Sequence, residues 1–276
     1  MRTTLVFLLS TLSAGLCLAQ PSVDEILRRV AENQEKAAEA RKTVVYKQDT
    51  FVRLLRTNGK LSREEKRQYT VTPDEKGTDK KLDKFEGRYE RGGKILTYDK
   101  PDFQYKDTDI DGDLIEDLTD DMINDKKSRD GISKDLFPLT KDEQAHYTFK
   151  LEGTRKVGTV EAYRVSFEPK KEDASRSWAG EVLIHPEEFQ PMMVTTKLSM
   201  KIPRAVKIIF GIDIKQLGFN VSYRKVDDGL WFPSTYGTEF GIKVLFGYKR
   251  NITMSLKNDD FRRTMAQSTI AFEESK

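Results

Sequence analysis

The stretch DTDIDGDLIEDL, residues 107–118, begins like a calcium-binding loop. Aspartates alternate over its first five positions, and Gly112 stands at the sixth, where an EF-hand loop requires glycine. The twelfth position is Leu118, which has no oxygen to close the coordination shell. Two interpretations therefore stay open: a solvated acidic insertion, or an irregular calcium site with the ligands Asp107, Asp109, Asp111 and Glu116.

Residue patterns for catalysis are sparse. The two histidines, His146 and His185, have no metal-binding spacing to each other. The chain has no glycine-rich phosphate loop, no Gly-x-Ser-x-Gly elbow and no His-Glu-x-x-His motif. Its 45 acidic residues make carboxylate pairs expected by chance. We therefore expect a protein that is not an enzyme and that needs no cofactor, with calcium as the one open alternative.

The N-terminus has the layout of a secretory signal peptide. Arg2 precedes an apolar run over residues 5–12, and Cys17 and Ala19 stand at the −3 and −1 places before a cleavage site. The run is too short to span a bilayer, and no second such run follows. We expect cleavage after Ala19 and a soluble protein exported to the periplasm. Acylation of Cys17 is the alternative, which the large Leu16 before it disfavours.

Composition limits the remaining classes. Removal of a signal peptide at residues 1–19 would take away the only cysteine, so residues 20–276 would form a single domain without disulfide or zinc thiolate. Charged residues make up 34% of the chain, yet the net charge is only +3. This balance gives no argument for a nucleic-acid partner.

One amphipathic helix is expected at the start of the mature chain. Ser22 and Glu25 form a capping-box pattern, and apolar residues recur at helical spacing after them. This predicts a helix over residues 23–41 whose apolar face packs on a sheet.

After this helix the hydrophobic period changes to two. Strand-like runs are separated by short turns, of which Asn58-Gly59, Gly92-Gly93 and Asp228-Gly229 are the clearest. Closely spaced strands with short turns predict an antiparallel meander of about nine to eleven strands rather than βαβ units.

The faces of these strands differ in polarity. Glu64, Lys66 and Gln68 alternate with an opposite face that carries Tyr69 and Val71. When one face of an antiparallel sheet is solvated, the opposite, apolar face must be covered by other parts of the chain. One helix is too small to cover it. Either the sheet closes on its own side chains, or a cavity remains.

Two segments resist this pattern. Residues 99–135 are acidic and poorly periodic, and we interpret them as an inserted loop with one helical turn around residues 114–123. Residues 202–214 are strongly apolar and fit either a buried strand or a short helix lying on the sheet.

The order of these elements resembles a known family. The turn NGKLSREEKRQYTV, the strand–turn–strand AGEVLIHPEEFQPMMV and the segment DDGLWFPSTYGTEF follow the capped helix in that order. Over residues 22–264 this pattern is similar to the LolA/LolB-like superfamily, and more closely to its outer-membrane lipoprotein-sorting-like branch. Gly180 to Met193 resembles the branch's strand–turn–strand, and Trp231 and Pro233 resemble its Trp-x-Pro strand.

The resemblance implies an α+β fold: a strongly curved antiparallel sheet, or incomplete barrel, whose concave face is covered by the N-terminal helix and short helices. It also implies an apolar interior that shields the acyl chains of a lipoprotein from water, at about 0.8 kcal/mol per buried methylene. The acidic segment at residues 99–135 makes this chain longer than the carriers, and their buried arginine aligns with no single position here.

Aromatic side chains are the candidates for the wall of such a cavity, because rings provide wide apolar surfaces. An ordinary sheet core is the alternative role for the six that we single out: Trp178, Phe219, Tyr223, Trp231, Phe240 and Phe246.

Three functions remain in contention. The first is a periplasmic carrier or binding protein for lipid or lipoprotein acyl chains, which does not span the membrane. The second is an envelope-stress sensor or assembly factor that binds protein segments with the same fold. The third is a structural domain stabilised by calcium.

Overall fold

The computed structural model describes residues 20–73, 77–120, 138–171, 178–199, 213–215, 217–243 and 247–264. The elements in chain order are α1 Val23–Arg41, β1 Val44–Leu55, β2 Leu61–Pro73, β3 Thr78–Arg91, β4 Lys94–Tyr98, α2 Ile110–Leu118, α3 Lys141–Gln144, β5 Tyr147–Val157, β6 Val160–Pro169, β7 Trp178–Ile184, β8 Pro191–Leu198, β9 Asp213–Lys215, β10 Gly218–Asp227, β11 Leu230–Lys243 and β12 Lys249–Arg263. The expected signal peptide lies outside the described residues, as do Phe246 and residues 202–212.

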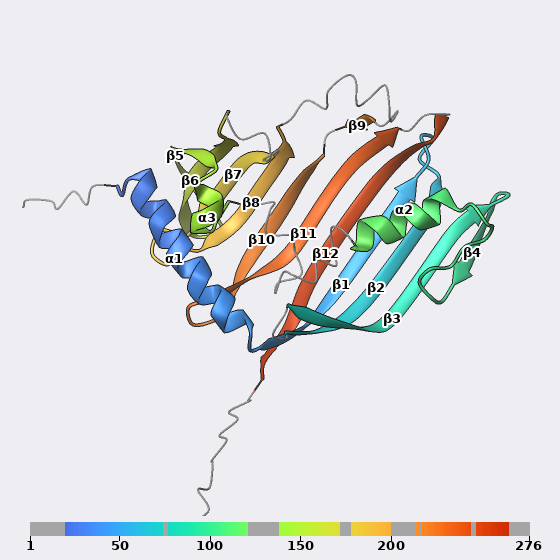
Figure 1. Cartoon of the computed structure of the whole chain (residues 1–276), viewed down its shortest axis with the longest axis horizontal. Coiled ribbons are helices and arrows are strands. Elements are labelled where there is room, and N and C mark those ends of the chain that lie inside the picture. Colours follow the sequence, from blue (N-terminus) through green and yellow to red (C-terminus); the bar gives the residue numbers. More distant parts are fainter. Residues whose placement is uncertain are drawn as a thin grey trace, which may run out of the picture.

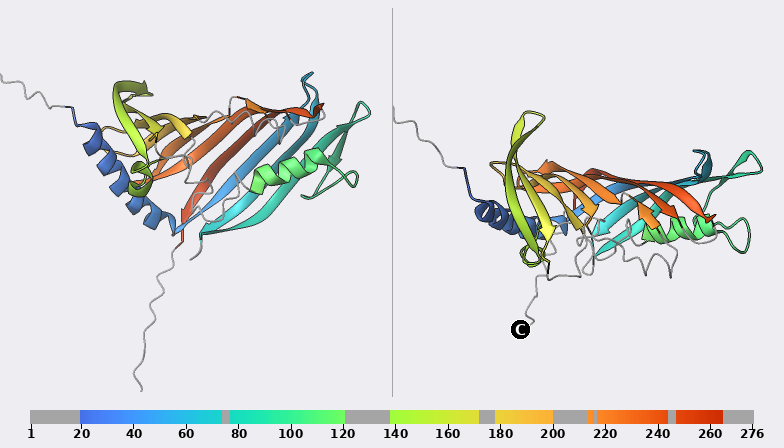
Figure 2. Two further views of the ribbon diagram at one scale, coloured as in Figure 1. Left: turned by 45° about the horizontal axis from the view of Figure 1, so that its top comes forward. Right: turned by 90° about the horizontal axis from the view of Figure 1, so that it is seen from above.

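The strands form one antiparallel sheet that does not close into a barrel. Eleven of the twelve strands follow a single path, in the order β4-β3-β2-β1-β12-β11-β10-β8-β7-β6-β5, and β9 pairs with β11 beside it. The last strand, β12, lies between β1 and β11 and so joins the two halves of the meander (Figure 1). The predicted α+β fold with an open antiparallel sheet is confirmed. The sheet coils along this path, so that β5 and β6 stand steeply against β1–β3 (Figure 2).

Burial alternates along the strands as the period of two predicts. On β1, Val52 and Leu54 are buried and Arg53 between them points to the opposite side. We call the face with Val52 and Leu54 the inner face and the face with Arg53 the outer face. The predicted hairpin turns are confirmed, with Gly59, Gly93 and Gly229 each at positive φ.

The helix α1 has the predicted bounds and covers one end of the inner face. The hydroxyl of Ser22 accepts a hydrogen bond from the amide of Glu25 at 3.2 Å, which satisfies one free donor of the first turn. Its buried apolar stripe contributes Ile26, Leu27 and Val30 to the main core cluster. It lies across the part of the sheet around β5–β11 (Figure 1).

The helix α2 lies on the inner face at the other end, over β1 and β2 (Figure 1). It spans Ile110–Leu118 and so begins four residues before the helical turn predicted around residues 114–123. Asp109 explains the early start, because its side chain caps the helix by accepting from the amide of Gly112 at 3.2 Å. The end of the predicted turn, beyond residue 120, lies outside the described residues.

Membrane crossing was not expected from the sequence. Among the helices in the described part of the chain, none has the length and apolar character needed to cross a bilayer.

Close packing between β7 and β8 generates the first prediction. A Cβ added at Gly180 would lie 2.0 Å from the carbonyl oxygen of Thr195, whereas a Cβ at Gly237 has nothing nearer than 3.9 Å. Gly180→Ala should therefore lower the free energy of unfolding by about 1–3 kcal/mol through overpacking. Gly237→Ala is the matched control and should leave it unchanged or raise it by about 0.5 kcal/mol. Urea denaturation of both variants measures this, and equal stabilities would contradict the packing described.

Candidate functional site

Of the six predicted cavity aromatics, five lie within the described residues. Phe219 is fully buried, stacks on Tyr236 with ring centroids 5.3 Å apart, and meets Trp178 edge-on at 4.8 Å. Tyr223 and Phe240 belong to the same cluster on the inner face. These four side chains pack on core neighbours, and a ligand-binding role for them stays a prediction.

Trp231 lies apart from that cluster, at the start of β11. Its indole nitrogen donates to the carboxylate of Glu188 at 2.9 Å, and its ring lies 5.8 Å from that of His185. The Trp-x-Pro segment therefore anchors the turn between β7 and β8. No contact of Phe246 can be described, because that residue lies outside the described residues.

The aspartates of the opening stretch contact arginines. Asp109 accepts from Arg63 at 2.5 Å, and Asp111 accepts from Arg250 at 2.8 Å, from Tyr248 at 2.6 Å and from Ser62 at 2.5 Å. In the described ranges, no group of three or more acidic, histidine or cysteine side chains is arranged to hold a metal ion. The calcium site stays a prediction. Of its four proposed ligands, Asp107 is exposed and Glu116 pairs with Arg67 at 2.6 Å.

A row of buried charges on β2 was missed by sequence reasoning. Arg63, Glu65 and Arg67 are 1%, 3% and 5% exposed, and they share the inner face with Tyr69 and Val71. The period of two did place these three residues on the inner face, because their odd residue numbers match those of Tyr69 and Val71 on the same strand. Their charged type nevertheless indicated solvent, because such residues are almost never fully buried unless paired.

Tyr98 links these charges from the neighbouring strands. Its hydroxyl donates to Glu65 at 2.6 Å and accepts from Arg63 at 2.7 Å. The ring reaches both because it lies across Gly87, where a Cβ would come within 2.2 Å of it. Burial, together with the carboxylate of Glu65, raises the pKa of Tyr98, so the phenol keeps its proton.

The helix α2 supplies the remaining partners of the buried charges on β2. Burial favours the uncharged form of Arg67, but its hydrogen bond to Glu116 and the charge of Glu65 outweigh burial and raise its pKa. With Asp109 on Arg63 and Glu116 on Arg67, α2 is attached to β2 by ion pairs and by buried Ile115. Every charge here has a partner, so the cluster fixes α2 in place and offers no free acid, base or nucleophile.

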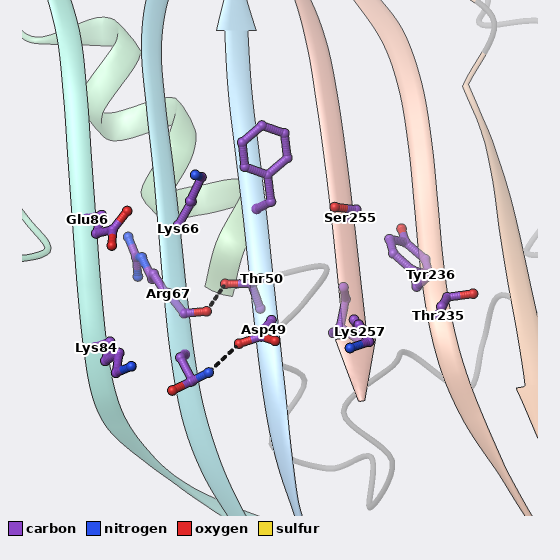
Figure 3. Close-up of a pocket in the computed structure, with 13 residues that line it drawn as sticks. Asp49, Thr50, Lys66, Arg67, Lys84, Glu86, Thr235, Tyr236, Ser255 and Lys257 are labelled. Atoms are coloured by element: carbon purple, nitrogen blue, oxygen red, sulfur yellow. Dashed lines mark hydrogen bonds between the residues drawn. The ribbon is translucent and has the colours of Figure 1, made fainter. Parts of the chain in front are cut away.

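The outer face carries a groove of 520 Å³ over β3, β2, β1, β12 and β11 (Figure 3). It lies on the side of the sheet away from α2, and charged side chains of both signs line it among uncharged ones (Figure 3). Gln68 donates to Asp49 at 2.8 Å, and the lining residues include two aromatic side chains, Phe51 and Tyr236. Balanced, partly exposed charges are what the wet face of an antiparallel sheet requires. A further hollow of 580 Å³ lies over β2–β4 and has a more polar lining than the outer-face groove.

A larger groove, of 930 Å³, lies between α1, α3 and the start of β5. Its apolar lining comes from Leu27 and Ala31 of α1 and from Tyr147 and Phe149 of β5. Leu27, Ala31 and Tyr147 are 5%, 5% and 3% exposed, so they form a floor below the surface. We call this the α1–β5 groove. On this floor, Leu27 and Tyr147 belong to the main core cluster.

Comparisons with known proteins find similarity in structure and not in sequence. No family model matches the chain, and neither does any curated protein sequence. A putative outer-membrane lipoprotein-sorting protein domain from Vibrio parahaemolyticus matches at 9% identity and a TM-score of 0.42, over 90% of this chain and 96% of that one. A DUF1329 family protein from Desulfovibrio piger matches at 10% identity and a TM-score of 0.39, over 89% and 95%.

A LolA superfamily protein from Nitrosomonas europaea also matches, at 7% identity and a TM-score of 0.37, over 86% of this chain and 93% of that one. Matches at such low identities and TM-scores carry no argument about this chain, so its function has to be argued from its own geometry.

The ion pairs under α2 generate the second prediction. Asp109→Ala would leave Arg63 buried without its carboxylate and would remove the cap of α2, so unfolding should become easier by about 3–5 kcal/mol. Asp107→Ala, on an exposed carboxylate two residues away, should change stability by less than about 0.5 kcal/mol. Guanidinium denaturation measures both, and equal effects of the two substitutions would show that the buried pair is unimportant.

The pKa of Asp111 generates the third prediction. Burial raises this pKa, but hydrogen bonds from Arg250, Ser62 and Tyr248 outweigh burial and hold it below the ordinary 3.8. A depressed folded-state pKa stabilises the fold above pH 3.8, and this contribution is lost as the pH falls further. Stability should therefore fall less steeply between pH 5 and 3 in Asp111→Asn than in the wild type or Asp107→Asn. Identical slopes in all three proteins would refute this.

Proposed function

We propose that this chain is a non-enzymatic binding protein of the periplasm that holds an acyl chain of a lipid or lipoprotein in the α1–β5 groove. One observation carries the proposal: a 930 Å³ groove whose floor is made by core side chains. Its volume lies in the range of ligand pockets, about 300–1,000 Å³, and its floor is apolar while its walls carry charged side chains. Each methylene that leaves water for such a floor gains about 0.8 kcal/mol.

The two sides of α1 are held by different numbers of hydrogen bonds. This difference suits a site that must admit a flexible chain. Away from the groove, Asn33 donates to the carbonyl of Glu188 at 2.8 Å, and Gln34 donates to Gln190 at 2.9 Å. On the groove side, Gln144 of α3 donates to the carbonyl of Leu27 at 3.1 Å. The helix α1 is thus held firmly by the β7–β8 turn, while its groove side borders α3 and β5.

Two described sets of titratable side chains away from the groove make structural contacts, which favours binding over catalysis. His185 accepts hydrogen bonds through Nδ1 from the amides of Glu187 and Glu188, at 3.3 and 3.2 Å, which is a structural role in a turn. The other cluster of titratable groups, under α2, consists of paired charges.

A second candidate function is the binding of a protein segment. Among the described strands, β5 pairs with β6 alone and forms one edge of the sheet. An extended peptide adds to such an edge through main-chain hydrogen bonds. The same groove lies along the first residues of β5, from Tyr147 to Phe149, so a bound strand would border it.

A pair of matched substitutions on α1 generates the fourth prediction. Ala31 lines the groove, whereas Ala38, two turns later, is exposed. Ala31→Phe should fill the groove and weaken binding of a long-chain fluorescent fatty acid at least about tenfold, while Ala38→Phe should bind like the wild type. Titration by fluorescence, with circular dichroism to check folding, measures this.

The outcomes separate the two candidates. If the wild type takes up neither the fatty acid nor lipid from an extract of the expression host, the acyl-chain proposal fails. If it instead co-purifies with polypeptide, and backbone N-methylation of that polypeptide abolishes binding, then strand addition at β5 explains the groove.

A further inference from the structure

The two walls of the α1–β5 groove carry opposite charge. The α1 wall presents the carboxylates of Asp24, Glu32 and Glu35 and one cation, Arg28. The facing wall, formed by α3 and the end of β6, presents Lys141 and Lys170. The lining residues therefore give the α1 wall a net negative charge and the facing wall a net positive charge.

Some charged side chains of the α1 wall form ion pairs with neighbours on the helix, and others do not. Arg28 bonds Glu25 at 2.8 Å and Glu32 at 2.5 Å, so these charges pair within the helix. Asp24 and Glu35 have no ion pair within the described residues. They stand eleven residues apart on the groove stripe, about 16 Å along the helix axis. Asp24 and Glu35 are thus two separate carboxylates of this wall that are available to a cation.

The facing wall keeps its positive charge. Lys170 donates to the carbonyl of Ala145 at 2.7 Å, a bond that positions the ammonium without neutralising it. Lys141 has no ion pair within the described part of the chain. The hydrogen bond from Gln144 to Leu27 places α3 beside the first half of α1. The basic wall and the acidic wall therefore line the same groove.

We propose that the α1–β5 groove selects lipids with a zwitterionic headgroup. The ammonium of the headgroup would lie toward the free carboxylates of α1 and its phosphate toward Lys141 and Lys170. An anionic headgroup would be attracted by the two lysines but repelled by the two unpaired carboxylates. A cationic headgroup would be attracted by the carboxylates but repelled by the lysines. This inference rests on the proposed function, because the acyl chain supplies the affinity and the charged walls supply the choice of headgroup.

The test uses three soluble probes with the same saturated chain: myristoyl-lysophosphatidylcholine, myristoyl-lysophosphatidylglycerol and tetradecyltrimethylammonium. They are zwitterionic, anionic and cationic, respectively. Calorimetry below their micelle concentrations should show the zwitterionic probe bound about fivefold tighter than either other probe, as expected for two partly exposed ion pairs. Raising the salt concentration to about 0.5 M should reduce this preference, because exposed pairs are screened.

Charge reversal of each wall makes the test sharper. Asp24→Lys with Glu35→Lys should shift the preference to the anionic probe, and Lys141→Glu with Lys170→Glu should shift it to the cationic probe. The control matched to the lysine variant, Lys60→Glu with Lys156→Glu, makes the same change in net charge on exposed residues away from the groove and should keep the wild-type order.

Failure of this inference is distinguishable from failure of the proposed function. Equal binding of all three probes by the wild type would overturn the zwitterion assignment and leave the acyl-chain groove standing. Absence of binding by any probe would overturn both. A shift in preference in the control variant as large as that in the groove variants would show that net charge alone acts, which also overturns the assignment.

Discussion

An open sheet of this length leaves a wide inner face that has to be removed from water, and this constraint shapes the rest of the molecule. The described helices cover it at opposite ends and by different means. The helix α1 covers one end with an apolar stripe, in the way that amphipathic helices usually pack. The helix α2 covers the other end with ion pairs around a single fully buried side chain, Ile115.

This division decides which parts of the molecule are available to a ligand. Under α2 the charges are buried, paired and bonded to Tyr98, so opening that end would leave Arg63 and Arg67 without partners. Separating such pairs costs several kcal/mol. At the α1 end the floor is apolar, and exposing it to a hydrocarbon chain leaves no buried charge unpaired. The groove at α1 is therefore the end where an oily ligand meets the smaller penalty.

Sequence patterns predicted the parts of the fold that depend on local chemistry. The Ser22 cap, the glycine turns and the strict alternation of β1 are each visible in a few neighbouring residues. The α2 network was not predictable in this way, because Arg63 and Asp109 are 46 residues apart and become neighbours only in the folded sheet. Alternating aspartates suggested a calcium loop, while the structure uses one of them as a helix cap and arginine partner. The α1–β5 groove could likewise not be predicted from the sequence, because its walls come from three elements, α1, α3 and β5, that meet only in the folded chain.

The central claim is that an acyl chain lies on the apolar floor between α1 and β5. A long-chain fatty acid with a photoactivatable diazirine at its methyl end tests this most directly, with cross-linked residues mapped by mass spectrometry. The account predicts cross-links in α1 around Leu27 and Ala31 and in β5 around Tyr147 and Phe149. Cross-links confined to the outer face around Phe51, or no cross-link under conditions where free fatty acid is in excess, would contradict it.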